Sequence, residues 1–388
     1  MYTKQKIRNI FILLLWEAIL ASSFSCQGKD YRHDDIILIP SKDTTIQVKI
    51  SYPENWTKKD KIIIWSCPPL ENDFYPDSII NNRDLGAGSM LRNIFLENGY
   101  VNIEYLGRND SIIVLNRKYS ASDINTKAQD LDNLLDYIQK TKSLKNKKII
   151  LVGYSEGGNV NCIVGSKRTD ISGMLQLACS ALTGKELVTY QRDPKNLFEA
   201  MLRFTFHGNQ KYMDQFINKL SSLDSYYTAD MKGLLLFLKE NIEPIEKIIY
   251  QFEDRDSIYS HMDLFLRERW ARENEETKEF VKDFETYYKA FAGNITPQQI
   301  TVRTFEPEKY YPFISCPILA VQGTKDMKID CYPNMKRMEQ LLTKGGNRNL
   351  KKMVLEEYNH DLVKWDGKGK YYIEDSVIHQ IVKWLDEQ

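Results

Sequence analysis

The segment at residues 147–158, KKIILVGYSEGG, decides the fold. Its residues 149–152 are a short, unbroken apolar run with β-branched side chains, which predicts a strand buried on both faces of a parallel sheet. Gly153, Ser155 and Gly157 then form the pattern G-x-S-x-G, which places a serine on a sharp turn between a strand and a helix. Glycines at such a turn permit unusual backbone angles and a close approach of strand and helix. We therefore expect the hydroxyl of Ser155 to stand exposed above the sheet.

Strand and helix patterns alternate on both sides of this segment. An antiparallel pair is expected first, and the later strands alternate with amphipathic helices, which predicts a parallel sheet with right-handed crossovers. The predicted strands cover residues 36–39, 45–50, 62–65, 100–105, 149–152, 171–178, 317–321 and 352–356. The predicted helices cover residues 89–97, 128–141, 334–343 and 377–385, with a further helix directly after the glycines.

Strand patterns almost vanish between residues 184 and 310. This region instead carries apolar and aromatic residues at helical spacing, which predicts an all-helical insertion. The chain is thus divided into a first core part at 34–183, a helical cap at 184–310 and a second core part at 311–388. Helices in the cap are expected at residues 197–206, 212–220, 231–241 and 280–291.

The N-terminus has the order of a secretory signal peptide. Basic residues precede an apolar run at 10–16, and small residues at 21–25 lead to Cys26. The apolar run is shorter than a membrane span requires. Residues 1–26 resemble a bacterial lipoprotein signal, and this resemblance implies that Cys26 becomes the acylated first residue of an exported chain.

Two residues depart from that lipoprotein pattern. Glu17 interrupts the apolar region, and Ser23 stands where such signals more often have an aliphatic residue. Our expectation is an exported protein, anchored to a membrane in the periplasm or at the cell surface through a lipid on Cys26. The alternative is a cytoplasmic protein with a disordered or helical N-terminal extension.

Charge and cysteine content exclude several classes of function. The 388 residues contain 53 basic and 53 acidic side chains, so the formal net charge is zero and no global field attracts nucleic acid. The six cysteines form no C-x-x-C pair and no metal-ligand spacing with the five histidines. We expect most of the cysteines to be buried thiols, and we expect no metal and no organic cofactor.

Three residues in sequence order could support acyl transfer from a serine. Such a reaction needs a hydroxyl nucleophile, an imidazole that takes its proton, and a carboxylate that orients the imidazole. Ser155, Asp326 and His360 each follow a predicted strand, in the order serine, acid, histidine. Because the carboxyl ends of parallel strands meet at one edge of a sheet, we expect the three side chains to meet there. Asp330 is a competing candidate for the acid.

Four segments carry a resemblance to a known family. They are GYSEGG, CPILAVQGTKD, LLTKGGNRNL and YNHDL, which begin at residues 153, 316, 341 and 358. They resemble the α/β-hydrolase serine esterases, in particular the branch near the serine-aminopeptidase-like hydrolases. The similarity covers residues 91–104, 128–182 and 311–388.

This resemblance implies an α/β fold with a mostly parallel central sheet. Helices would cover both faces of the sheet, and a helical cap would be inserted after the sixth strand. It also implies that Ser155 is the nucleophile, Asp326 the acid and His360 the base.

The loop after the third predicted strand departs from the family pattern. Relatives tend to have a glycine-rich loop where this chain reads Ser66-Cys67-Pro68-Pro69. The backbone N–H of Glu156 is expected to be one oxyanion donor. The second donor should come from this loop, but a proline has no N–H to give, so Cys67 is the candidate. Tyr154 also departs from the histidine that commonly precedes the serine in these esterases.

The expected function is a serine hydrolase that cleaves a small-molecule carboxylic (acyl) ester through an acyl-enzyme. An aminopeptidase-like peptidase or a thioesterase would use the same three residues. The alternative from another class is a non-catalytic binding lipoprotein that keeps the fold, and the prolines in the oxyanion loop are its best support.

Overall fold

The computed structural model describes residues 32–41, 44–54, 56, 59–67, 87–108, 111–114, 117–191, 244–272, 296–365 and 371–388. The predicted signal peptide and Cys26 lie outside this set, so export and acylation stay predictions. The four expected cap helices at 197–206, 212–220, 231–241 and 280–291 also lie outside it, as do Pro68 and Pro69. Within the described ranges, no helix is both long enough and apolar enough to cross a membrane.

The chain divides into two compact units. One contains residues 111–121 and 192–304 together with the first 21 residues, and the other contains residues 22–110, 122–191 and 305–388. The described elements of the first unit are a hairpin, a helix at residues 244–251 and two further helices. Their bounds are β5 (Ser111–Val114), β6 (Arg117–Ser120), α10 (Arg255–Arg272) and α13 (Pro297–Arg303). The hairpin was not predicted, because strands of four residues carry too little periodicity to be distinguished from a loop.

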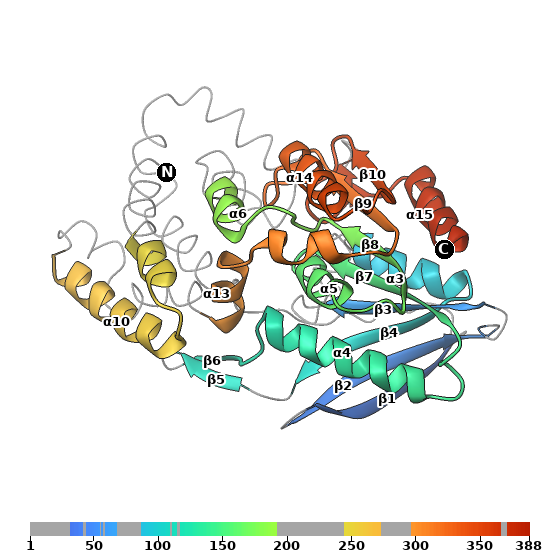
Figure 1. The fold of residues 1–388 in the computed structure, drawn as a ribbon, viewed down its shortest axis with the longest axis horizontal. Helices are drawn as coiled ribbons and strands as arrows, with labels where there is room; N and C mark the ends of the chain where they lie inside the picture. The colour runs from blue at the N-terminus through green and yellow to red at the C-terminus, as the bar shows by residue number, and fades with distance from the viewer. Residues whose placement is uncertain are drawn as a thin grey trace, which may run out of the picture. The chain divides into compact units, whose positions relative to one another are not determined.

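An eight-stranded sheet forms the second unit, in the order β1-β2-β4-β3-β7-β8-β9-β10 (Figure 1). β2 pairs antiparallel with both β1 and β4, and every other neighbouring pair is parallel. This order, with its antiparallel second strand, is that of the α/β-hydrolase fold, so the predicted fold class is confirmed. The strands are β1 (Arg32–Ser41), β2 (Thr44–Pro53), β3 (Lys61–Cys67), β4 (Val101–Arg108), β7 (Lys148–Tyr154), β8 (Ile171–Leu177), β9 (Ile318–Gly323) and β10 (Leu350–Leu355).

Five described helices of this unit match predicted ones, and one further helix lies at the start of the segment predicted as the cap. They are α3 (Ala87–Glu97), α4 (Ile124–Lys140), α5 (Gly157–Gly165), α6 (Gly184–Gln191), α14 (Cys331–Lys344) and α15 (Asp375–Glu387). Short 3-10 turns at Pro307–Lys309 and Tyr311–Phe313 and the two-residue strands β11 (Lys364–Trp365) and β12 (Tyr371–Tyr372) complete it. The first turn of α4 precedes its predicted start at 128, because Asp123 caps it by accepting from the backbone N–H of Thr126 at 2.7 Å.

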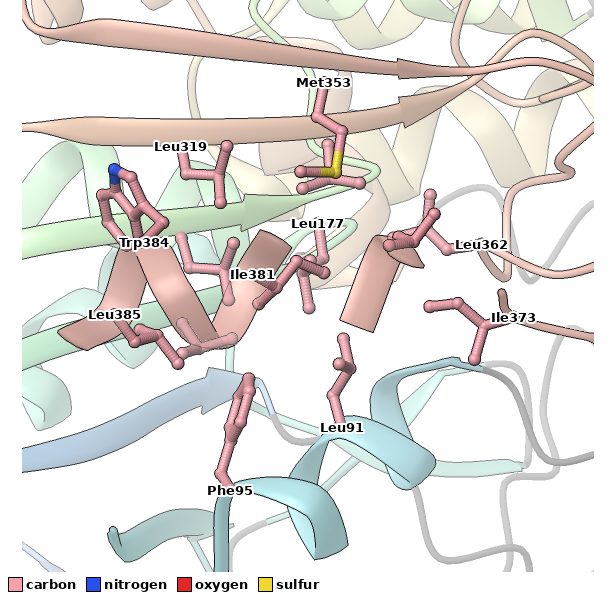
Figure 2. Close-up of a cluster of buried hydrophobic side chains, with 14 of the residues drawn as sticks. Leu91, Phe95, Leu177, Leu319, Met353, Leu362, Ile373, Ile381, Trp384 and Leu385 are labelled. Carbon is pink, nitrogen blue, oxygen red and sulfur yellow. The ribbon is translucent and has the colours of Figure 1, made fainter. Parts of the chain in front are cut away.

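Side chains on one face of the sheet pack against α3 and α15. Figure 2 shows Ile381 and Trp384 of α15 near the strand residue Leu319, with Leu91 and Phe95 of α3 on the other side of α15 in the same buried cluster. Alternate residues of a strand point to opposite faces, so the strands β3 and β7, which lie in the middle of the sheet, need apolar residues on both. α5 packs against β3, β7, β8 and α4. This packing fixes β7, the strand that leads to Ser155, within the core.

Four cysteines of the described chain are buried, as expected. They are Cys162, Cys179, Cys316 and Cys331.

Candidate active site

Ser155 lies on the sharp turn that joins β7 to α5. Its backbone φ is 51°, in the left-handed region that residues with a side chain rarely adopt. The turn is held because the Ser155 N–H donates to the carbonyl of Leu177 at 2.9 Å and the Ser155 carbonyl accepts from Gly158 N–H at 3.0 Å. A Cβ at Gly153 would lie 2.6 Å from the Gly158 nitrogen, which only glycine avoids. The predicted strand-turn-helix geometry is therefore present.

Gly158 supports the same turn. A Cβ at this position would lie 2.3 Å from the Cβ of Cys179, in the loop after β8. Gly158 comes one residue after the G-x-S-x-G pattern. Because it has no side chain, the start of α5 can pack closely against the carboxyl end of β8. The backbone of the turn is thus confined on both sides.

The structure brings Ser155, Asp326 and His360 together at the carboxyl ends of β7, β9 and β10. His360 Nε2 lies 3.0 Å from Ser155 Oγ, and His360 Nδ1 lies 2.8 Å from Asp326 Oδ2. Asp326 is 2% exposed and His360 is 6% exposed. This chain of hydrogen bonds has the geometry in which an imidazole can take a proton from a serine hydroxyl while a carboxylate fixes its tautomer.

Asp330, the competing acid, lies at a different place. It is the residue that precedes the first turn of α14, and Asp326 is the carboxylate that contacts the imidazole. Burial raises the pKa of the Asp330 carboxyl above its usual value. The geometry therefore selects Asp326 from the two candidates.

Four donors surround the carboxylate of Asp326. Its Oδ1 accepts from the backbone N–H groups of Lys328 at 2.7 Å and Ile329 at 3.0 Å. Its Oδ2 accepts from the Gln322 amide at 2.5 Å as well as facing His360. Hydrogen bonds of this kind compensate the loss of water around a buried carboxylate anion and fix its two oxygens.

The loop that carries His360 is joined to the loop that carries Asp326. Lys325 N–H donates to the Tyr358 carbonyl at 2.8 Å. A Cβ at Gly323 would lie 2.2 Å from that same carbonyl oxygen, so glycine is needed for the two loops to approach. Asn359 closes the turn, because its side-chain oxygen accepts from Val363 N–H at 3.2 Å. The distance between acid and base is therefore determined by backbone contacts.

Tyr154 and Asp361 flank His360. The Tyr154 hydroxyl donates to Asp361 Oδ1 at 2.8 Å, and its ring centroid lies 5.7 Å from that of the imidazole. Burial raises the pKa of the Tyr154 phenol, and the negative charge of Asp361 raises it further, so the hydroxyl stays a donor. The sequence predicts a plain surface charge at Asp361. Its side chain is exposed but also takes part in this contact.

Both candidate oxyanion donors lie beside the turn. Glu156 immediately precedes the first residue of α5, and its side chain pairs with Lys127 of α4 at 2.5 Å. Cys67 is the last residue of β3 and pairs in register with Gly153. The neighbouring Ser66 hydroxyl donates to the Gly157 carbonyl at 3.0 Å. The role of each backbone N–H stays a prediction, since the loop beyond Cys67 lies outside the described residues.

Sequence patterns missed the polar residues behind the acid. Gln322 and Asn334 are both buried, and neither was named as a site residue. The available signal was a single glutamine in the apolar run of β9, directly before the glycine that leads to Asp326. Across the described part of the chain, no group of three or more histidine, cysteine, aspartate or glutamate residues could hold a metal ion.

No protein-family model and no curated protein matches the chain. Among solved structures, it is similar to an esterase of Pyrococcus furiosus, with a TM-score of 0.49 and 11% identity over 95% of this chain and 97% of that one. Est1E from Butyrivibrio proteoclasticus gives a TM-score of 0.44 at 11% identity, over 91% of this chain and 98% of its own. A thermophilic esterase from Thermogutta terrifontis gives a TM-score of 0.41 at 14% identity, over 91% of this chain and 98% of its own. Similarity this low does not specify a reaction or a substrate.

Proposed function

We propose that the chain is a serine hydrolase that cleaves carboxylic esters through an acyl-enzyme on Ser155. The observation that carries the proposal is the position of the His360 imidazole, 3.0 Å from the Ser155 hydroxyl on one side and 2.8 Å from Asp326 on the other. A serine held at a φ of 51° between β7 and α5 adds to it, because such strain is expected where a side chain must be presented to a substrate.

The chemistry follows from these positions. Ser155 Oγ attacks the ester carbonyl carbon while its proton passes to His360 Nε2, and the carbonyl oxygen becomes an oxyanion. The N–H of Glu156 is the first donor to that oxyanion and the N–H of Cys67 is the second. His360 then gives the proton to the leaving alcohol as the C–O bond breaks. Water, deprotonated by the same imidazole, releases the acyl group as a carboxylic acid.

Asp326 has a separate role in this scheme. Its carboxylate holds the Nδ1 proton of His360, which leaves Nε2 unprotonated and able to accept from Ser155. The same charge stabilises the imidazolium that forms when the serine attacks. No metal and no organic cofactor takes part in these steps.

The proposal is tested by labelling the purified protein with a fluorophosphonate and locating the adduct by peptide mass spectrometry. We expect an adduct on Ser155 that is absent from the Ser155→Ala variant. Ser166→Ala is the matched control, because the Ser166 hydroxyl donates to the Ile163 carbonyl at the end of α5 and lies outside the proposed site. A folded protein without an adduct on Ser155 would instead support a binding protein that keeps the fold. A panel of ester, thioester and aminoacyl substrates then separates ester hydrolysis from the other acyl transfers.

Replacing Tyr154 with phenylalanine is expected to slow the labelling of Ser155 about threefold to tenfold. The substitution removes the 2.8 Å contact with Asp361 and keeps the ring beside the imidazole. One such hydrogen bond contributes about 1 kcal/mol of stability, and without it the turn that carries His360 holds the imidazole less firmly in place. Tyr332→Phe is the control, because that exposed hydroxyl contacts Glu356, which is not a residue of the proposed site. Equal labelling rates in the two variants would show that Tyr154 does not position the base.

A further inference from the structure

Two buried amide side chains lie behind Asp326, and neither takes part in the scheme above. Gln322 is the fifth residue of β9, and Asn334 lies in the first turn of α14. Gln322 is 1% exposed and Asn334 is fully buried. Buried amides are costly unless their donors and acceptors are satisfied, so their partners indicate what they stabilise.

Asn334 connects three segments of the chain. Its side-chain oxygen accepts from Ala181 N–H at 2.6 Å, and its amide nitrogen donates to the Cys179 carbonyl at 2.9 Å. Both partners belong to the loop after β8. The same amide nitrogen lies 3.3 Å from the side-chain oxygen of Gln322. Asn334 thus faces Gln322 with a donor.

This contact determines which way the Gln322 amide points. With its oxygen toward Asn334, its nitrogen faces Asp326 Oδ2 at 2.5 Å. The reversed amide would place two acceptors against each other at Asp326 and two donors against each other at Asn334. Only one orientation therefore satisfies both neighbours.

The oxygen that Gln322 contacts is the one that faces the imidazole. Asp326 Oδ2 accepts from Gln322 and lies 2.8 Å from His360 Nδ1, while Oδ1 is occupied by two backbone N–H groups. We infer that Gln322, oriented by Asn334, is a positioning residue that aligns Asp326 Oδ2 with His360 and limits the negative charge this oxygen offers to the imidazole. The inference rests on the proposed function, since it concerns the same three residues.

Other titratable groups near the carboxylate do not replace this role. Burial raises the pKa of the Cys331 thiol to about 12 and raises that of the Tyr154 phenol, so both stay neutral at the pH of an assay. Five titratable groups of the described chain face Asp326 or its loop from neighbouring elements: Tyr154 of β7, Tyr190 of α6, Asp330 and Cys331 at the start of α14, and His360. The Tyr190 hydroxyl donates to the Asp326 backbone carbonyl at 2.8 Å.

The test is the pH dependence of fluorophosphonate labelling of Ser155 in the Gln322→Met variant. Methionine has a similar length but no donor, so more negative charge remains on Asp326 Oδ2 and the protonated imidazole is held more strongly. A protonated imidazole cannot accept from Ser155. We therefore expect the loss of labelling on acidification to begin at a pH about half a unit higher, together with an about fivefold lower maximal rate.

Gln176→Met is the matched control. Gln176 lies on β8 beside β9 and is 1% exposed, and its hydrogen bonds to described residues are long, to the Gly158 carbonyl at 3.4 Å and to Cys162 Sγ at 3.6 Å. The same chemical change is thus made one strand away, with no contact to the Asp326 carboxylate. The acidic limb, which is the pH range in which labelling is lost on acidification, is expected to stay at its original pH.

Asn334→Leu provides a second test that does not alter Gln322. Without the donor at Asn334 the Gln322 amide can rotate, so a shift in the same direction is expected. An acidic limb that stays unchanged in both folded variants would overturn the inference. A wild-type protein that takes no label on Ser155 would instead overturn the proposed function, so the two failures are distinguishable.

Discussion

Asp326→Asn is expected to lower kcat for ester hydrolysis about ten-thousandfold without unfolding the protein. The introduced asparagine would keep an oxygen for the backbone donors of Lys328 and Ile329, so its amide nitrogen would face both His360 and the Gln322 amide nitrogen. A donor at that place requires Nδ1 to be the acceptor of the imidazole. The proton then resides on Nε2, which faces Ser155 Oγ at 3.0 Å and can no longer accept from it.

Asp330→Asn is the matched control for this prediction. The change is chemically identical and lies four residues further along the same loop. Asparagine is as good as aspartate at the residue before a helix, so the start of α14 is expected to be kept. Steady-state kinetics on a simple ester, with circular dichroism to verify folding, separates the two. Equal losses in both variants would contradict the assignment of Asp326 as the acid.

The sequence was sufficient to place the three candidate residues because they follow strong local signals. The buried strands are apolar runs, and the residues that matter come directly after them, so an error of one or two residues in a strand end does not move Ser155 or His360 away from the sheet edge. Choosing between Asp326 and Asp330 was harder. The two lie in the same loop, and only the backbone contacts of that loop determine which carboxylate faces the imidazole.

The supporting residues could not be predicted in the same way. Gln322 was visible as a polar residue in a buried strand, but its partner is set by the rotation of α14, which brings Asn334 inward. The contact between Tyr154 and Asp361 joins two segments 207 residues apart in the chain. Such pairs depend on how helices and strands pack against one another, and no local sequence pattern predicts that packing.

A second buried carboxylate, Asp130 of α4, holds the antiparallel edge of the sheet. It is fully buried and accepts from Ser41 at 2.6 Å, from Tyr105 at 2.8 Å and from two nitrogens of Arg108 at 2.7 Å each. These partners belong to β1 and β4, so one side chain joins a helix to two strands. Both oxygens of the carboxylate accept hydrogen bonds, and the planar guanidinium of Arg108 donates one to each oxygen.

Asp130→Ala is expected to reduce the free energy of unfolding by about 3 to 5 kcal/mol, because it removes the counter-charge of an arginine that is itself only 10% exposed. The control is Asp136→Ala on the same helix. Asp136 is 56% exposed, and its partner Arg168 also pairs with Asp132 and Asp170, so a loss of about 0 to 1 kcal/mol is expected there. Urea unfolding followed by circular dichroism measures both. A loss for Asp130→Ala no larger than that of the control would mean that Asp130 does not stabilise the contact of α4 with β1 and β4.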